Sequence, residues 1–113
     1  MIAISSLSRG LLACALLVSA GAALAANPDL GRQKAEQVCA SCHGKDGNTP
    51  IDPSYPKLAG QHKDFLERAL LDYRSEARKN AIMVGQAKQL SRDDVRNLAA
   101  YYSSLPGGLS VKR

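Results

Sequence analysis

Aromatic side chains are scarce in this chain of 113 residues, which has no tryptophan, one phenylalanine and four tyrosines. A chain of this length has room for one small domain, and a small domain buries only a modest fraction of its surface. Few large side chains then leave the core short of apolar volume, a deficit that a bound cofactor or metal can offset. The shortage therefore predicts a single domain whose core is completed by a large apolar group.

The sequence also lacks strand patterns, since β-branched and aromatic residues nowhere alternate over four positions. Helical signals are present instead: Asn27 can cap a helix that begins at Pro28, and Ser91 can cap another whose first turn carries two aspartates. We predict an all-α fold with helices over residues 28–39, 62–77, 84–90 and 91–105. The face of the second helix that we expect to be buried consists of Phe65, Leu66, Ala69, Leu70 and Tyr73.

Residues 44–61 contain repeated glycine and proline breaks together with asparagine and aspartate. This composition predicts an irregular loop rather than a helix or a strand. Structureless loops of this length are uncommon inside small domains unless they have a function. A loop that wraps around a bound cofactor would satisfy that condition.

The first 25 residues have the pattern of a signal peptide. Arg9 supplies a positive charge, residues 10–24 form an almost unbroken apolar run, and Ala23-Leu24-Ala25 matches a small-x-small cleavage site. The run is shorter than the ~20 residues that a membrane-spanning helix needs, which argues against a retained anchor. A lipid-attachment site at Cys14 is the alternative, but Arg9 lies too close to it to leave a full apolar segment. We expect residues 1–25 to be removed on export to the periplasm, leaving residues 26–113 as the mature domain with no stable membrane insertion.

The charge of the mature domain is mildly positive, because losing Arg9 lowers the formal charge only from +5 to +4. With a modest charge, an exported chain and no recognition motif, nucleic acid is not expected as a partner. The lysines either keep the surface solvated or steer the domain toward acidic patches on other proteins, and the sequence leaves both readings open. They are Lys45, Lys57, Lys63, Lys79 and Lys88.

Cysteine usage carries the strongest signal, in the stretch from Cys39 through Cys42 to His43. A Cys-x-x-Cys-His sequence fits a redox dithiol, a zinc site or covalent attachment of haem. A redox dithiol of the thioredoxin type belongs between a strand and a helix, and this chain has no predicted strand. A closed zinc site needs four donors, and His62 would complete the count, but no second pair of ligands at short spacing accompanies it.

Haem attachment explains the spacing more fully. Two thiols three positions apart on one helical turn can form thioethers with the two vinyl groups of one porphyrin, which places His43 under the iron. Met83 is then the candidate for the sixth ligand, because the only other methionine is Met1 in the signal peptide. A lone methionine is more often a core residue, and His62 is the alternative ligand; we interpret His62 as a residue at the start of a helix.

These features resemble class I cytochrome c over the whole mature chain. The resemblance rests on Gly31 eight positions before Cys39, on Cys39-Ala-Ser-Cys42-His43, on Pro56-Lys57-Leu58 and on Met83 followed by a helix with the sequence LAAYY. The segments YPKLAGQH, RKNAIM and LAAYYSSL are similar to one half of the two-domain dihaem periplasmic cytochromes. The chain has one haem motif, so the resemblance implies a monohaem relative.

The resemblance implies a small class I cytochrome c fold in which Gly31 packs against the last helix near Leu98 and Tyr101. It also implies that the carbonyl of Pro56 accepts a hydrogen bond from the ring of His43. One departure is Ala35, where many members of the family carry an aromatic residue at the helix crossing. The crossing is expected to be smaller for that reason.

The expected function is that of a single-electron carrier, with one haem c held by Cys39 and Cys42 and ligated by His43 and Met83. Filled axial positions leave no place for a substrate, so the chain is not expected to be an enzyme and no residue is assigned as catalytic. Its expected partners are a reductase, a dehydrogenase or a terminal oxidase, met by a monomer through transient contacts. The alternative is the electron-accepting haem subunit of a larger dehydrogenase.

A first prediction concerns the exported protein. Because thioethers are covalent, acid acetone should leave the pigment on the polypeptide, and the intact mass should equal residues 26–113 plus one haem. A pigment that enters the acetone phase, or a mass without the added tetrapyrrole, would contradict the haem assignment. A mass that includes residues 1–25 would contradict the predicted cleavage site alone.

Overall fold

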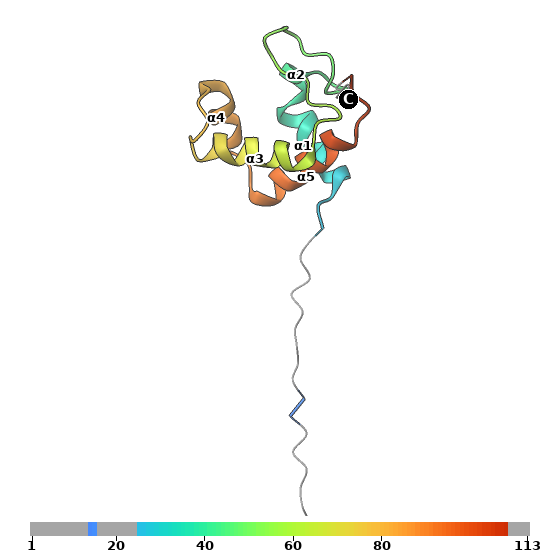
Figure 1. Cartoon of the computed structure of the whole chain (residues 1–113), viewed down its shortest axis with the longest axis vertical. Helices are drawn as coiled ribbons and strands as arrows, with labels where there is room; N and C mark the ends of the chain where they lie inside the picture. The colour runs from blue at the N-terminus through green and yellow to red at the C-terminus, as the bar shows by residue number, and fades with distance from the viewer. Residues whose placement is uncertain (1–13, 16–24, 109–113) are drawn as a thin grey trace, which may run out of the picture.

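Five helices account for the regular structure in the part of the chain that the computed structural model describes, residues 14–15 and 25–108 (Figure 1). The prediction of an all-α fold is confirmed, and the described residues include no strand. The helices are α1 (Pro28–Val38), α2 (Ala40–His43), α3 (Lys63–Arg74), α4 (Ala81–Ala87) and α5 (Arg92–Ser104).

The crossing of α1 and α5 is the most extensive contact between described helices (Figure 1). Gly31 on α1 is buried against the backbone carbonyl of Asn97 on α5, so the two helices approach more closely than a side chain would allow. The Asn97 side chain extends this contact, because its Oδ1 accepts a hydrogen bond of 2.8 Å from the N–H of Asn27. The missing side chain at Gly31 therefore sets the distance between the first and last helices.

Both helices begin where the sequence predicts. The Asn27 side chain accepts hydrogen bonds from the N–H groups of Asp29 and Leu30, with Pro28 in the first turn. At the start of α5, Ser91 Oγ accepts from the N–H of Asp94, and the Asp94 carboxylate accepts from the N–H of Ser91. This reciprocal capping box fixes the first turn of α5.

The core is small and lies where α1 and α3 pack against α5. Leu98 and Val95 on α5 are the largest fully buried side chains, and Ala35, the departure noted at the helix crossing, is 1% exposed. The buried cluster consists of Ala35, Leu66, Leu90, Val95, Leu98, Ala99 and Tyr102.

Three helix boundaries differ from the prediction by three residues each: the end of the second helix and both ends of the helix expected over residues 84–90, which is Ala81–Ala87. The second helix ends at Arg74 rather than at residue 77, because Glu76 takes a left-handed conformation with φ of 65° and the N–H of Arg78 turns back to the carbonyl of Asp72. The following helix starts at Ala81 and not at residue 84. Its cap is Asn80, whose side chain accepts from the N–H groups of Ile82 and Met83.

None of the described helices is long and apolar enough to cross a membrane. The signal peptide predicted over residues 1–25 lies almost wholly outside the described residues.

The close approach at Gly31 generates a stability prediction. In Gly31→Ala the new Cβ would overlap the Asn97 carbonyl and come within 2.9 Å of Tyr101 Cβ, so the helices must separate. We expect the free energy of unfolding to fall by ~1–3 kcal/mol in a denaturant titration.

Gly85→Ala is the matched control, because Gly85 lies inside α4 and a Cβ there meets nothing within 4 Å. It should raise stability by ~0.5–1 kcal/mol through reduced freedom of the unfolded chain. Equal effects of the two substitutions would show that close packing at Gly31 does not limit the crossing.

Candidate functional site

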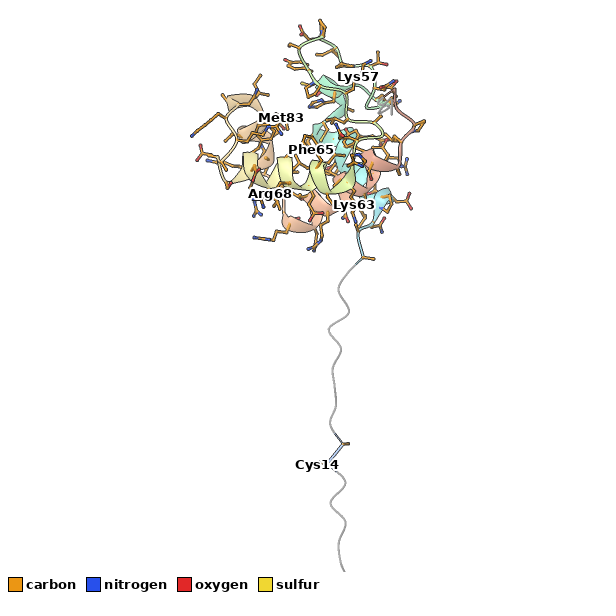
Figure 2. All side chains as sticks on the ribbon, in the orientation of Figure 1. Cys14, Lys57, Lys63, Phe65, Arg68 and Met83 are labelled. Carbon is orange, nitrogen blue, oxygen red and sulfur yellow. The ribbon has the colours of Figure 1, made fainter. Side chains whose placement is uncertain are left out.

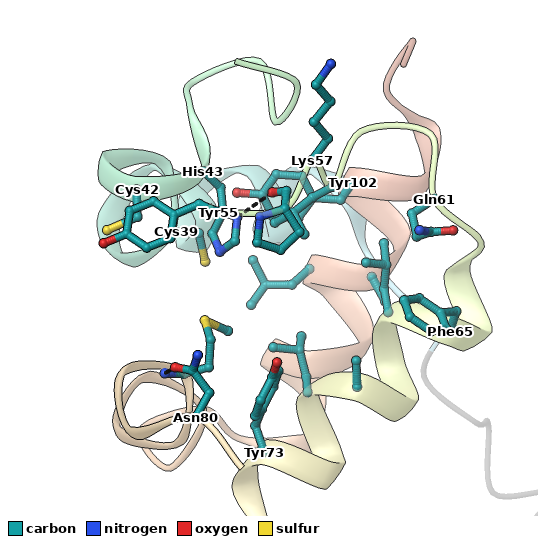
Figure 3. A pocket seen from close by; sticks show the side chains of 18 of the residues that line it. Cys39, Cys42, His43, Tyr55, Lys57, Gln61, Phe65, Tyr73, Asn80 and Tyr102 are labelled. Carbon is teal, nitrogen blue, oxygen red and sulfur yellow. Dashed lines mark hydrogen bonds between the residues drawn. The ribbon is translucent and has the colours of Figure 1, made fainter. Parts of the chain in front are cut away.

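A cavity of about 320 Å³ opens between α2, α3, α4 and α5, and its lining is mainly apolar (Figure 3). The four residues predicted to form the site, Cys39, Cys42, His43 and Met83, all line it. Figure 3 shows Cys39, Cys42 and His43 on one side of this space, with Tyr73 and Asn80 on the other. The structure thus brings together side chains that are up to forty-four positions apart in the sequence.

The short helix α2 determines how the first three of these side chains are spaced. Cys39 ends α1 and caps α2, and its carbonyl accepts hydrogen bonds from the N–H groups of Cys42 and His43. Gly44 then ends α2 with φ of 91°, and a Cβ at that position would overlap the carbonyl of Thr49. This turn places both thiols and the imidazole along one side of the cavity.

The ring of His43 is buried, with 7% of the residue exposed. Its Nδ1 lies 2.9 Å from the carbonyl oxygen of Pro56, which is the contact that the resemblance implied (Figure 3). A carbonyl oxygen can only accept, so the hydrogen is on Nδ1, and in the neutral ring the lone pair is then on Nε2. His43 is therefore oriented as a ligand that offers Nε2 to a metal.

Met83 approaches the cavity from α4. It lies in the first turn of that helix, and its own N–H donates to the side chain of Asn80, 3.0 Å away. The residue is half-buried, and Figure 2 shows it on the inward side of α4, across from Phe65 on α3. The cap at Asn80 thus holds the backbone of Met83 in place.

The floor of the cavity is formed by α3 and α5. All five residues predicted as the buried face of the second helix line the cavity, together with Leu98, Ala99 and Tyr102 from α5. The prediction that Phe65 is buried is wrong, since 51% of it is exposed. The reason is that this face of α3 borders an open cavity rather than protein side chains. Of these five residues, only Leu66 is buried.

Two cations line the cavity, Lys57 from the loop and Arg78 from the turn after α3. The Arg78 guanidinium lies over the rings of Tyr73 and Phe65, 5.0 Å and 6.0 Å from their centroids. No aspartate or glutamate is among the described residues that line the cavity. The closeness of Arg78 to Met83 in the sequence is equally compatible with plain helix surface, and its position at the cavity depends on the left-handed turn at Glu76.

Residues 44–61 form the irregular loop that the sequence predicted. The loop is tied to the helices through Gly47, whose carbonyl accepts from the N–H groups of Leu58 and Ala59. Near its start, Asp46 accepts from the N–H groups of Asn48 and Thr49, and these hydrogen bonds lower the pKa of the Asp46 carboxyl. The loop thereby presents the Pro56 carbonyl to His43.

Burial also affects the thiol of Cys39. It raises the pKa of Cys39 to about 11, an effect that the Tyr102 hydroxyl partly offsets. The thiol is therefore protonated at neutral pH in the folded polypeptide. Tyr102 is one of the buried residues of α5.

The alternative donor His62 lies elsewhere. It precedes α3, is exposed, and is not among the described residues that line the cavity. In the described part of the chain, no group of three or more histidine, cysteine, aspartate or glutamate side chains is arranged to hold a metal ion. The four donors that a zinc site would need are therefore not brought together.

The lining of the cavity fits a haem. Its apolar surfaces suit a porphyrin, its two cations suit the carboxylates at the porphyrin edge, and its imidazole and thioether suit iron. The two thiols line the same cavity. Each of these features comes from a different segment of the chain, so the match is a property of the fold as well as of the motif.

Comparison with known proteins agrees with this match. The family model described as cytochrome c matches residues 20–106. Cytochrome c4 of Thiocapsa roseopersicina is 41% identical over 80 residues, which cover 71% of this chain and 41% of that protein. A thiosulfate dehydrogenase electron acceptor of Thiomonas intermedia is 44% identical over 71 residues, covering 62% of this chain and 33% of the relative.

Among solved structures, reduced recombinant cytochrome c4 from Pseudomonas stutzeri superposes with a TM-score of 0.60 at 31% identity. The match covers 72% of this chain and 50% of that one. The chain spans half or less of the length of these three relatives.

Proposed function

This chain belongs to the cytochrome c family, and we propose that it carries single electrons between proteins on one covalently bound haem. The observation that carries the proposal is the convergence of Cys39, Cys42, His43 and Met83 on one apolar cavity. Cys39 and Cys42 would hold the haem through thioethers, and His43 and Met83 would bind its iron.

The haem, when bound, supplies a one-electron couple at its iron. His43 contributes a neutral ring whose hydrogen bond to Pro56 increases its basicity and fixes its plane. Met83 contributes a soft, neutral thioether, a ligand type that raises the reduction potential relative to a second histidine. If His43 and Met83 both bound the iron, no site would be left for a substrate, in keeping with a carrier rather than an enzyme.

Rigid placement of these ligands supports rapid electron exchange. His43 is buried and hydrogen-bonded, and Met83 lies in a capped helical turn, so neither has to move far when the charge of the site changes. Lys57 and Arg78 keep positive charge at the border of the cavity, where acidic groups of a partner can approach. Contacts of this kind are small and transient, which a carrier needs in order to turn over.

We place the protein in the periplasm, after removal of residues 1–25 as a signal peptide, and expect a monomer that exchanges electrons with a reductase, a dehydrogenase or a terminal oxidase. The second candidate is a dedicated electron-accepting subunit of a dehydrogenase. It is favoured by the similarity to the Thiomonas intermedia protein named as an electron acceptor of thiosulfate dehydrogenase. Co-purification with a dehydrogenase at low salt would distinguish the two.

The ligand role of Met83 can be tested with Met83→Leu, which keeps the volume and removes the sulfur. We expect loss of the far-red sulfur-to-iron charge-transfer band of the oxidised protein. We also expect a fall in reduction potential on the order of 0.1 V, a fraction of the ~0.8 V range that axial ligands cover. Absorption spectroscopy and a redox titration measure both.

His62→Gln is the matched control, because His62 is exposed and does not line the cavity. It should leave the band and the potential unchanged. If the band survives in Met83→Leu but disappears in His62→Gln, the ligand assignment is wrong while haem attachment through Cys39 and Cys42 still stands.

The role of positive charge at the cavity can be tested with Lys57→Glu. The reduced protein would be mixed with ferricyanide, a small anionic oxidant that samples the accessible haem edge. At low ionic strength we expect the second-order rate constant to fall several-fold. The difference from the wild type should vanish near 1 M salt, where the screening length is only ~3 Å.

Lys88→Glu is the control, since it makes the same charge change at a residue that pairs with Glu76 and does not line the cavity. Its effect should be much smaller at every salt concentration. Equal effects of the two substitutions would mean that net charge, and not charge at the cavity, controls the encounter.

A further inference from the structure

The chain that follows α5 packs closely against the end of the loop that carries Pro56. A Cβ built on Gly107 would overlap the carbonyl oxygen of Ala59 and would lie 3.2 Å from the amide nitrogen of Gly60, so the two backbones meet with no side chain between them. Gly108, one position later, has nothing within 4 Å of its Cβ position. The close contact therefore belongs to Gly107 and is not shared by its neighbour.

The same end of the loop is also held by other backbone groups. The N–H of Ala59 donates a hydrogen bond of 2.9 Å to the carbonyl of Gly47, and the N–H of Gly60 donates one of 3.0 Å to the carbonyl of Tyr102 on α5. Ala59 is completely buried, with 0% of it exposed. Its two peptide groups thus lie between the start of the loop, α5 and the contact with Gly107.

The position of the Pro56 carbonyl depends on the two ends of its segment. Residues 52–57 make no backbone–backbone hydrogen bond to a described helix. Before them, the N–H of Ile51 donates to the carbonyl of Cys42 on α2, and after them residues 58–60 are held as described above. Only two residues separate Pro56 from Ala59, so a displacement of Ala59 is transmitted to the Pro56 carbonyl.

We propose that Gly107 is a positioning residue for His43: its contact with Ala59 holds the loop in the conformation that keeps the Pro56 carbonyl on Nδ1 of the imidazole. The inference rests on the proposed role of His43 as an iron ligand. Gly107 is not among the described residues that line the cavity, so it acts through the loop and not by touching the ring.

The contact has a chemical consequence at His43. The Nδ1 hydrogen bond to Pro56, 2.9 Å long, makes the imidazole a better electron donor, which favours oxidised iron. Loss of the contact at Gly107 should therefore weaken this bond and raise the reduction potential of the haem-loaded protein. A residue that contributed only to overall stability would change neither the bond nor the potential of the folded protein.

The test compares haem-loaded Gly107→Ala with haem-loaded Gly108→Ala. Neither glycine has a positive φ, so both substitutions test the space around the residue and not the freedom of its backbone. In Gly107→Ala the added methyl group must push the two backbones apart. In the reduced, diamagnetic protein we expect an upfield shift of the His43 Nδ1 proton resonance, a higher reduction potential and a lower denaturant midpoint. Gly108→Ala should match the wild type in all three.

The combination of readouts separates the outcomes. A lower denaturant midpoint in Gly107→Ala, with the Nδ1 resonance and the potential of the wild type, would overturn the inference, because the contact would then serve stability alone. Equal shifts in Gly107→Ala and Gly108→Ala would also overturn it. In either case, pigment retained in acid acetone and an intact far-red band leave the proposed function standing. Wild-type protein without covalent haem would instead defeat the proposed function itself.

A measurement on the wild type covers the case in which Gly107→Ala does not fold. Hydrogen exchange at low denaturant would follow the His43 Nδ1 proton and the Gly60 amide proton, which bonds to α5 beside the Gly107 contact. If one opening of the loop exposes both protons, they should show the same opening free energy and the same dependence on denaturant. A His43 proton that exchanges through an opening that leaves the Gly60 amide protected would overturn the inference.

Discussion

The approach of α1 to α5 at Gly31 is the constraint on which the rest of the structure depends. The end of α1 leads directly through Cys39 into α2, while α5 supplies Leu98, Ala99 and Tyr102 to the floor of the cavity. If the two helices moved apart, the thiols would move relative to that floor. A residue without a side chain at the crossing therefore controls the geometry of a site to which it contributes no atom.

The long loop solves a second problem, which is to hold a buried imidazole in one tautomer. His43 is only 7% exposed, so an unpaired Nδ1 would be costly, and no helix supplies its partner. The Pro56 carbonyl is that partner. The loop brings it there by turning back on itself at Gly47, whose carbonyl accepts hydrogen bonds from the N–H groups of Leu58 and Ala59. The same turn packs against the ring of Tyr102, so the orientation of His43 and the burial of the phenol depend on one piece of backbone.

Much of the fold and site could be predicted because the signals are local. Caps at Asn27 and Ser91 need only neighbouring residues, and the spacing of Cys39, Cys42 and His43 follows from one helical turn. The prediction failed where the outcome depends on distant parts of the chain. The second helix stops early at a left-handed Glu76, for which no sequence signal exists, and Phe65 is half exposed because its helix faces a cavity. The positions of Arg78 and of the Tyr102 hydroxyl depend on those same tertiary arrangements.

The distribution of apolar side chains links the cofactor to folding. Among the described residues, Leu98 and Val95 are the largest side chains that are fully buried, whereas the apolar face of α3 borders the cavity and is mostly only partly buried. Without an occupant, the residues of that face would contribute little burial to offset the loss of chain entropy. A covalently held porphyrin would cover them, so its attachment and the final packing of this domain are expected to be coupled, as metal binding and folding are in other small domains. The shortage of aromatic residues then has a physical meaning, since the volume that they would fill is the volume that the haem requires.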